Sequence, residues 1–223
     1  MDPEKTLSTL RMKRATRSTV FGTICVVLVL YGLASILTVY LPVLRVEAQY
    51  QYKQMLTKLG AQSLVQLIVP QVTFSTAGNT QHREFGIVIP ELGVNEPVIF
   101  NVDATSPTAY EAALQEGIAH AASTSIPDMG GIGYYFAHSS NPSFRTQYNA
   151  VFYLLGKLKG GEDIFVWHEG NKYHYRVTNS RVTTPDDVSF LQEGYTTESI
   201  VLQTCWPPGT TSKRLLVFGE RVQ

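Results

Sequence analysis

From residue 85 onward, short apolar runs recur between turn signals, and this rhythm constrains the fold more than any other feature. The runs are rich in β-branched and aromatic residues, as strands are. They cover residues 85–89, 97–100, 131–137, 163–169, 172–182, 199–205 and 214–222. Residues 169–172 separate two runs as a hairpin loop does. Because sheet edges must be paired or covered, we expect a mainly β domain, closed into a barrel, over residues 85–223.

Two short helical segments interrupt the predicted strands. Residues 107–116 form the clearer one, with Ser106 as the expected N-cap and Gly117 as the expected stop. A helical turn is also expected near residues 150–155.

A long uncharged stretch over residues 20–41 precedes the barrel. As a helix rising ~1.5 Å per residue it would cross a hydrocarbon layer ~30 Å thick, which predicts an N-terminal transmembrane helix. Basic residues are more frequent before it than after it, which predicts a cytoplasmic tail over residues 1–19 and an extracytoplasmic remainder: Lys5, Arg11, Lys13, Arg14 and Arg17 precede the stretch, and Arg45, Lys53 and Lys58 follow it. A cleaved signal peptide, with residues 46–48 as the cleavage site, is the alternative. Both interpretations export the barrel.

Residues 42–84 link the two parts. The polar stretch 47–59 has no strong helix breaker before Gly60 and predicts a helical stalk. Residues 61–84 mix one apolar patch with polar residues, which favours an entry strand and a loop before the barrel. His82 lies in this linker.

Charge and cysteine content exclude several functions. The formal net charge is +0, with 18 basic and 18 acidic residues, so no overall field favours nucleic acid. Cys25 lies in the apolar stretch and Cys205 in the exported part, too far apart for a disulfide bond. With one exported cysteine and no close set of ligands, we expect no zinc. No acidic cluster supports calcium, and no cofactor is expected.

Three polar residues stand at the ends of predicted strands. Cys205 ends the run 199–205, and the two prolines after Trp206 force a turn. Arg214 begins the next strand, so a hairpin would bring it back beside Cys205. His138 follows the run 131–137 just before a turn signal, and could face the same mouth of the barrel.

These residue types suit nucleophilic catalysis by a thiolate. A nearby imidazolium or guanidinium lowers the pKa of a cysteine thiol from the ~8.5 of the free group. A histidine can protonate a leaving amine, whereas an arginine can only donate hydrogen bonds, for example to a developing oxyanion. Spacing alone does not show that the three side chains meet, and a buried structural Cys205 is the alternative.

The residues around Cys205 resemble a known family. Residues 200–205 (IVLQTC), followed by residues 214–217 (RLLV), resemble the sortase signature, a Thr-Leu-x-Thr-Cys strand followed by an arginine that opens the next strand. Residues 117–138 resemble the sortase segment that ends in the catalytic histidine. The short loop between Cys205 and Arg214 is most similar to class C sortases. Val201 departs from the signature threonine, and no Asp-Pro-aromatic lid before residue 85 or second helix at the C-terminus is found, so the class stays open.

The resemblance implies a sortase-type barrel and a cysteine transpeptidase. Cys205 would be the nucleophile, His138 the acid and base, and Arg214 the stabiliser of substrate and oxyanion. The enzyme would cleave a Leu-Pro-x-Thr-Gly-like sorting signal between Thr and Gly through a thioacyl intermediate. It would transfer the acyl group to an amine, for cell-wall anchoring or pilin assembly.

The implied partners are secreted or surface proteins that carry a C-terminal sorting signal, and an amine acceptor, either a peptidoglycan precursor or a pilin lysine. Tethering by one helix would bring enzyme, substrate and acceptor to one membrane surface. Two rivals remain: a membrane-tethered, non-catalytic peptide-binding barrel, and a purely hydrolytic cysteine peptidase.

Other candidates receive secondary interpretations. Thr204 and Trp206 are possible substrate contacts because they flank Cys205 in the sequence. His120 is expected to be structural, and His168 and His174 are expected on a solvated surface beside the 169–172 loop. The aromatic residues of the run 131–137 are expected in the core by the alternation of a strand: Tyr134, Tyr135 and Phe136.

Overall fold

The computed structural model describes residues 21–35, 44, 47–56, 84–139 and 151–222. The chain divides into two compact units, residues 1–46 and residues 47–223. The expected tail 1–19, the entry strand within 61–83, His82 and the turn after Ser139 lie outside the described residues.

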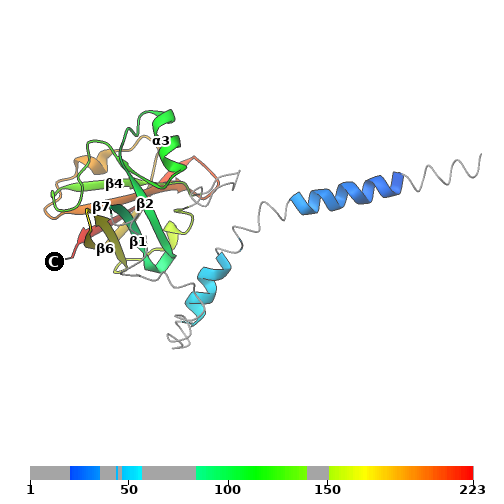
Figure 1. The fold of residues 1–223 in the computed structure, drawn as a ribbon, viewed down its shortest axis with the longest axis horizontal. Helices are drawn as coiled ribbons and strands as arrows, with labels where there is room; N and C mark the ends of the chain where they lie inside the picture. The colour runs from blue at the N-terminus through cyan, green and yellow to red at the C-terminus, as the bar shows by residue number, and fades with distance from the viewer. Residues whose placement is uncertain (1–20, 36–43, 45–46, 57–83, 140–150, 223) are drawn as a thin grey trace, which may run out of the picture. The chain divides into compact units, whose positions relative to one another are not determined.

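The second unit contains a closed barrel (Figure 1), as the recurring apolar runs predicted. Its strands are hydrogen-bonded in the circular order β1-β2-β3-β4-β7-β8-β6-β5. Their bounds are Phe85–Ile89 (β1), Val94–Val102 (β2), Ile118–Ala121 (β3), Ile132–Phe136 (β4), Asp163–His168 (β5), Asn171–Thr183 (β6), Ser199–Trp206 (β7) and Lys213–Arg221 (β8).

The barrel contains both antiparallel and parallel strand pairs. β5 and β6 form the expected hairpin, whose loop narrows to Glu169 and Gly170, both with positive φ, as a type I′ turn requires. β7 and β8 are antiparallel, whereas β4 runs parallel to β7 and β2 parallel to β3. β3 corrects the expected set of strands, because residues 118–121 were not among the apolar runs. It is held between β2 and β4.

Buried side chains lie on both faces of β4 and β7. Tyr135, Ile200 and Leu202 are each at most 1% exposed. Tyr134 and Phe136 are each 8% exposed, so the expectation that the aromatic run belongs to the core is confirmed. On β4 the side chains of Tyr134 and Phe136 point to one face and that of Tyr135 to the other.

Helix α3 (Pro107–Leu114) contacts β2 and β3. The Ser106 hydroxyl accepts a hydrogen bond from the Ala109 N–H, which confirms the expected N-cap. The helix ends at Leu114, before the expected stop at Gly117. A Cβ at Gly117 would lie 2.4 Å from the Pro97 carbonyl oxygen. Gly117 therefore permits close approach to β2.

In the described part of the chain, three short 3-10 segments connect the strands: η2 (Pro90–Leu92), η4 (Leu155–Lys157) and η5 (Ser189–Gln192). Residues 151–154 form the helical turn that leads into η4, and η5 lies in the connection from β6 to β7. Phe190 of η5 is fully buried against Tyr134 and Phe218. The β6–β7 connection thus covers part of the outer face of the sheet.

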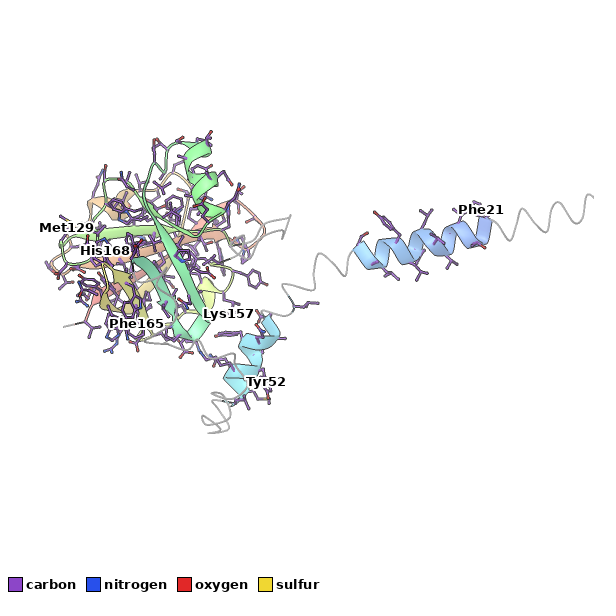
Figure 2. All side chains as sticks on the ribbon, viewed as in Figure 1. Phe21, Tyr52, Met129, Lys157, Phe165 and His168 are labelled. Carbon is purple, nitrogen blue, oxygen red and sulfur yellow. The ribbon has the colours of Figure 1, made fainter. Side chains whose placement is uncertain are left out.

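A helix over residues 47–56 packs on the barrel, in the region expected to form a stalk. Lys53 Nζ donates to the Pro90 carbonyl oxygen at 2.7 Å, and Lys157 Nζ lies 3.1 Å from Glu47 Oε1. Figure 2 labels Lys157 on the side of the barrel that this helix occupies. The stalk helix is therefore anchored at both η2 and η4.

The first unit contains a helix over residues 21–35. Its large apolar side chains are exposed, including Phe21 at 70% and Leu28 at 63%. Val20 and residues 36–41 of the predicted transmembrane helix lie outside the described residues. Within the described part of the chain, no helix combines the length and apolar character needed to span a membrane.

Candidate active site

Cys205 lies directly opposite Arg214 in the antiparallel register of β7 and β8. The hairpin between them therefore places the thiol and the guanidinium on the same face of the sheet. Cys205 is half-buried and is a free thiol. Arg214 is also half-buried, and its Nη1 donates to the carbonyl oxygens of Thr211 and Lys213. These bonds hold the guanidinium at the start of β8.

His138 reaches the same end of the barrel through the parallel pair β4–β7. Phe136 pairs with Gln203, and the Ala137 N–H donates to the Gln203 carbonyl oxygen at 3.1 Å, so the two backbones stay together beyond β4. His138 and Cys205 each follow this pair by two residues. Side chains two residues apart share a face of a strand. The topology thus brings His138 beside Cys205 at the ends of adjacent strands.

Two contacts hold His138 in place. Its Nε2 lies 3.5 Å from Glu111 Oε2 of helix α3, and its side chain is 23% exposed. Its carbonyl oxygen accepts a hydrogen bond from the Phe152 N–H at 3.1 Å. The imidazole is therefore partly accessible, with a carboxylate beside it and its backbone fixed to the 151–157 segment.

Tyr134 is a buried residue of β4 that interacts electrostatically with Arg214 and Cys205. Burial raises the pKa of its phenol well above the usual range, the positive charge of Arg214 opposes this rise, and Cys205 adds to it. Tyr134 therefore lies within electrostatic reach of both groups. Its ring packs edge to face on Phe190 in the core.

The two residues that flank Cys205 occupy different environments. Thr204 is 2% exposed, and its hydroxyl donates to the Ala137 carbonyl oxygen at 2.8 Å. This bond joins β7 to the end of β4 and turns the hydroxyl away from solvent. A substrate contact by Thr204 stays a prediction. Trp206 is half-buried, and its indole lies over Gly156, where a Cβ would come within 2.5 Å of the ring.

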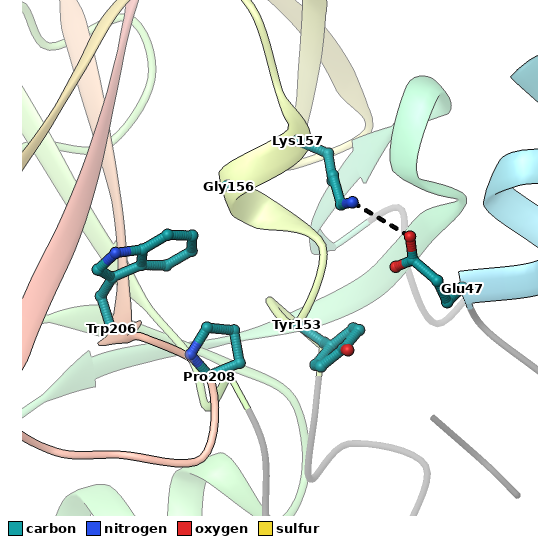
Figure 3. Close-up of a pocket in the computed structure, with 6 residues that line it drawn as sticks. All are labelled: Glu47, Tyr153, Gly156, Lys157, Trp206 and Pro208. Carbon is teal, nitrogen blue, oxygen red and sulfur yellow. Dashed lines mark hydrogen bonds and ion pairs between the residues drawn. The ribbon is translucent and has the colours of Figure 1, made fainter. Parts of the chain in front are cut away.

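A pocket of about 310 Å³ opens beside Trp206 (Figure 3). Trp206 and Pro208 line it from the end of β7 and the loop that follows. Tyr153, Gly156 and Lys157 line it from the 151–157 segment, and Glu47 from the stalk helix.

Three other histidines lie within the described residues: His120, His168 and His174. His120 is 1% exposed and stacks on Phe100 with ring centroids 5.3 Å apart, as a structural residue would. Burial lowers the pKa of His120, so the ring stays neutral near pH 7. His168 and His174 are half-buried beside the β5–β6 turn, and the His174 side chain is 29% exposed. His168 packs on Phe85, and His174 Nε2 lies 2.7 Å from Asp163.

Sequence reasoning missed two neighbours of the site. Glu111 lies on a helix that was predicted, but no sequence signal placed that helix beside His138. The 151–157 segment contacts the site through a backbone hydrogen bond to His138. Because this bond uses no side chain, no residue type in the sequence indicates it. As for metal ligands, the described ranges contain no group of three or more His, Cys, Asp or Glu arranged to hold an ion.

Comparisons with known proteins point to one family. The family model for the sortase domain matches residues 87–222. Sortase D of Bacillus subtilis (strain 168) is 23% identical over 137 residues, which cover 60% of this chain and 61% of that protein. Sortase A of Bacillus anthracis is 28% identical over 136 residues, which cover 61% and 58%. The match spans about three fifths of each curated relative.

Solved sortase C structures share the barrel. Sortase C-1 from Actinomyces oris superposes with a TM-score of 0.53 at 31% identity, over 62% of this chain and 73% of that one. The pilus-related sortase C of Group B Streptococcus gives a TM-score of 0.54 at 26% identity, over 66% and 70%. Because the family model covers more than half of the residues and the barrel is shared, the chain belongs to the sortase family.

Proposed function

We propose that the protein is a cysteine transpeptidase that cleaves a Leu-Pro-x-Thr-Gly-like sorting signal between Thr and Gly and transfers the acyl fragment to an amine. The observation that carries this proposal is the convergence of Cys205, Arg214 and His138 at the ends of three adjacent strands. Membership of the sortase family supports the same chemistry.

The acylation step uses each of the three residues once. The Cys205 thiolate attacks the carbonyl carbon of the Thr–Gly bond, and a C–S bond forms. Arg214 donates hydrogen bonds to the oxyanion of the tetrahedral intermediate. The C–N bond then breaks, and imidazolium His138 gives its proton to the departing glycine amine. A thioacyl enzyme remains, with His138 neutral.

The transfer step reverses the proton flow. An incoming primary amine attacks the thioester carbon, neutral His138 accepts a proton from the attacking nitrogen, and the C–S bond breaks to release the Cys205 thiolate. The imidazolium and thiolate that began the cycle are restored. No oxidant, metal or cofactor enters this balance.

Membrane tethering is part of the proposal. The exposed apolar side chains of helix 21–35, together with the uncharged sequence over residues 20–41, support a single membrane-spanning anchor with a cytoplasmic N-terminus. The barrel would then meet surface proteins and a peptidoglycan-precursor or pilin amine on the outer side. This placement raises the local concentration of both partners.

The test uses the full chain in detergent with Cys25→Ser, which leaves Cys205 as the single thiol. The protein is mixed with a Leu-Pro-x-Thr-Gly peptide library, and intact masses are recorded with and without an added amine. We expect a thioacyl adduct on Cys205 and cleavage between Thr and Gly, both abolished by Cys205→Ala. A chain that forms no adduct and resists alkylation at Cys205 would instead be a binding module.

A second readout separates transfer from hydrolysis. With an added amine, a transpeptidase yields the amide of the acyl fragment, whereas a hydrolytic peptidase yields the free acid at every amine concentration. If the free acid remained the product when the amine is added, the protein would be a hydrolytic peptidase and not a transpeptidase.

A further inference from the structure

The stalk helix over residues 47–56 has two unlike faces. One face carries both of its charged residues, and each of them binds the barrel. Glu47 Oε1 lies 3.1 Å from Lys157 Nζ of η4, and Lys53 Nζ donates to the Pro90 carbonyl oxygen of η2 at 2.7 Å. The barrel therefore occupies the charged face of this helix.

The other face is exposed and carries no charge. It consists of Ala48, Gln51, Tyr52 and Met55, which follow the i, i+3, i+4, i+7 spacing of one side of a helix. Tyr52 is 42% exposed and Met55 is 50% exposed. The Gln51 amide donates within the helix to Glu47 at 2.9 Å. This uncharged face thus presents an aromatic ring and a thioether to the surroundings.

The uncharged face begins shortly after the proposed membrane anchor. The uncharged stretch of the sequence ends at Leu41, and residues 42–46 (PVLRV) connect it to Glu47. A chain of this length spans at most about 20 Å when fully extended. The headgroup region on each side of the hydrocarbon is itself about 5–8 Å deep. The anchor therefore keeps the start of the stalk helix close to the lipid headgroups, where a short tether makes weak contacts effective.

The residue types of the uncharged face suit this boundary. Tyrosine is enriched where hydrocarbon meets headgroups, because its ring is apolar and its hydroxyl stays in contact with water. Methionine is a flexible apolar side chain that adapts to irregular surroundings. Arg45, in the connecting sequence, supplies a cation for lipid phosphates. An interfacial helix needs such an apolar side, and no charge opposes its contact with lipid.

We infer that the uncharged face of the stalk helix lies on the membrane surface, with Tyr52 and Met55 inserted among the lipid headgroups. The inference rests on the proposed membrane anchor and on no step of the proposed reaction. Because Glu47 and Lys53 fix the same helix to η4 and η2, the η2–η4 side of the barrel then faces the bilayer. The helix thus sets the height and tilt of the barrel above the lipid.

Quenching by lipid-borne nitroxide tests this contact in the full chain. Cys25→Ser and Cys205→Ala remove both thiols, Met55→Cys introduces one for an NBD fluorophore, and one copy is inserted per nanodisc of phosphatidylcholine and phosphatidylglycerol. The control label is at Met129→Cys, which is 74% exposed and lies away from the stalk helix in Figure 2. We expect headgroup nitroxide to quench the label at position 55 at least about threefold more than the control label.

A charge on the uncharged face should release it from the lipid. Tyr52→Glu, introduced into the Met55→Cys chain, should reduce quenching to the level of the Met129→Cys label. Gln49→Glu adds the same charge at an exposed position of the helix outside the uncharged face, and should keep most of the quenching. Tyr52→Phe keeps the ring and should match the parent chain, so a loss caused by unfolding is told apart from a loss caused by charge.

Three results would overturn the inference. Equal quenching of the labels at positions 55 and 129 would show that the helix stands clear of the lipid. Equal effects of Tyr52→Glu and Gln49→Glu would show that the uncharged face is not the contact. A label at position 55 that is shielded only with several copies per nanodisc would assign the face to a contact between copies. Failure of the anchor differs from all three, because alkaline carbonate would then extract the full chain from vesicles.

Discussion

Cys205 and Arg214 face each other across the antiparallel pair of β7 and β8. The short loop between them holds the arginine in place, because Nη1 of Arg214 donates to the carbonyl oxygens of Thr211 and Lys213. The relationship depends on strand register, so it is as rigid as the barrel itself. In the proposed mechanism, the guanidinium would bind the oxyanion that forms on a carbonyl attacked by the thiol.

Arg214→Lys tests this relationship. The substitution keeps the positive charge but loses the planar fork of donors, so we expect kcat for peptide cleavage to fall about 10²- to 10³-fold. Lys213→Ala, at the exposed neighbouring position, should leave the rate near that of the wild type. Cleavage kinetics with the library-selected peptide provide the measurement. A fall of less than threefold in Arg214→Lys would show that the guanidinium does not contact the transition state.

The ion pair between His138 and Glu111 predicts a smaller effect. Glu111 is 54% exposed, so the pair should contribute only about 0.2–1 kcal/mol. Glu111→Gln should therefore lower kcat/KM by at most about fivefold, and the difference from wild type should shrink at high salt. Glu116→Gln removes an equal charge from the residues just after helix α3 and serves as the control. Equal effects of both variants would assign the loss to net charge alone.

Much of the barrel could be predicted from local sequence. The hairpin β5–β6 follows from two β-branched and aromatic runs around Glu169 and Gly170, and the β7–β8 hairpin from two apolar runs around a proline turn. β3 could not be predicted this way. Its sequence IAHA is short and half alanine, and its strand conformation comes from pairing with β2 and β4.

The site was predictable to a similar degree. The proximity of Cys205 to Arg214 follows from a hairpin, which is a local feature. The proximity of Cys205 to His138 depends on the parallel pairing of β4 with β7, which are far apart in the chain. Only the family resemblance indicated this proximity. The position of Glu47 on the barrel likewise could not be predicted from the sequence, because the docking of the stalk helix depends on contacts with η2 and η4.

Thr204 predicts a cost in stability. Its buried hydroxyl bonds the Ala137 carbonyl oxygen, so Thr204→Val keeps the shape but leaves that acceptor unpaired, at a cost of about 1–3 kcal/mol in the free energy of unfolding. Thr210→Val removes a hydroxyl bond of the same length to an exposed carbonyl and should cost much less. Urea denaturation measures both. A Thr204→Val chain as stable as wild type would mean that water replaces the lost donor.

Glu96 predicts a pH dependence of folding. Burial raises the pKa of its carboxyl to about 7, and the residue pairs with the core residue Ile87. The unfolded chain releases this proton near the ordinary value, so the stability linked to protonated Glu96 is present below about pH 4.5 and is lost as the pH rises to 7. Since Glu96 keeps partial contact with water, we expect a loss of about 2 kcal/mol. Glu96→Gln should remove this pH-dependent loss of stability. Between pH 4.5 and 8, its free energy of unfolding, measured by urea denaturation, should therefore rise relative to that of the wild type. The exposed control Glu220→Gln should show no such relative rise. Parallel stability curves for Glu96→Gln and wild type would show that Glu96 is already ionised at low cost.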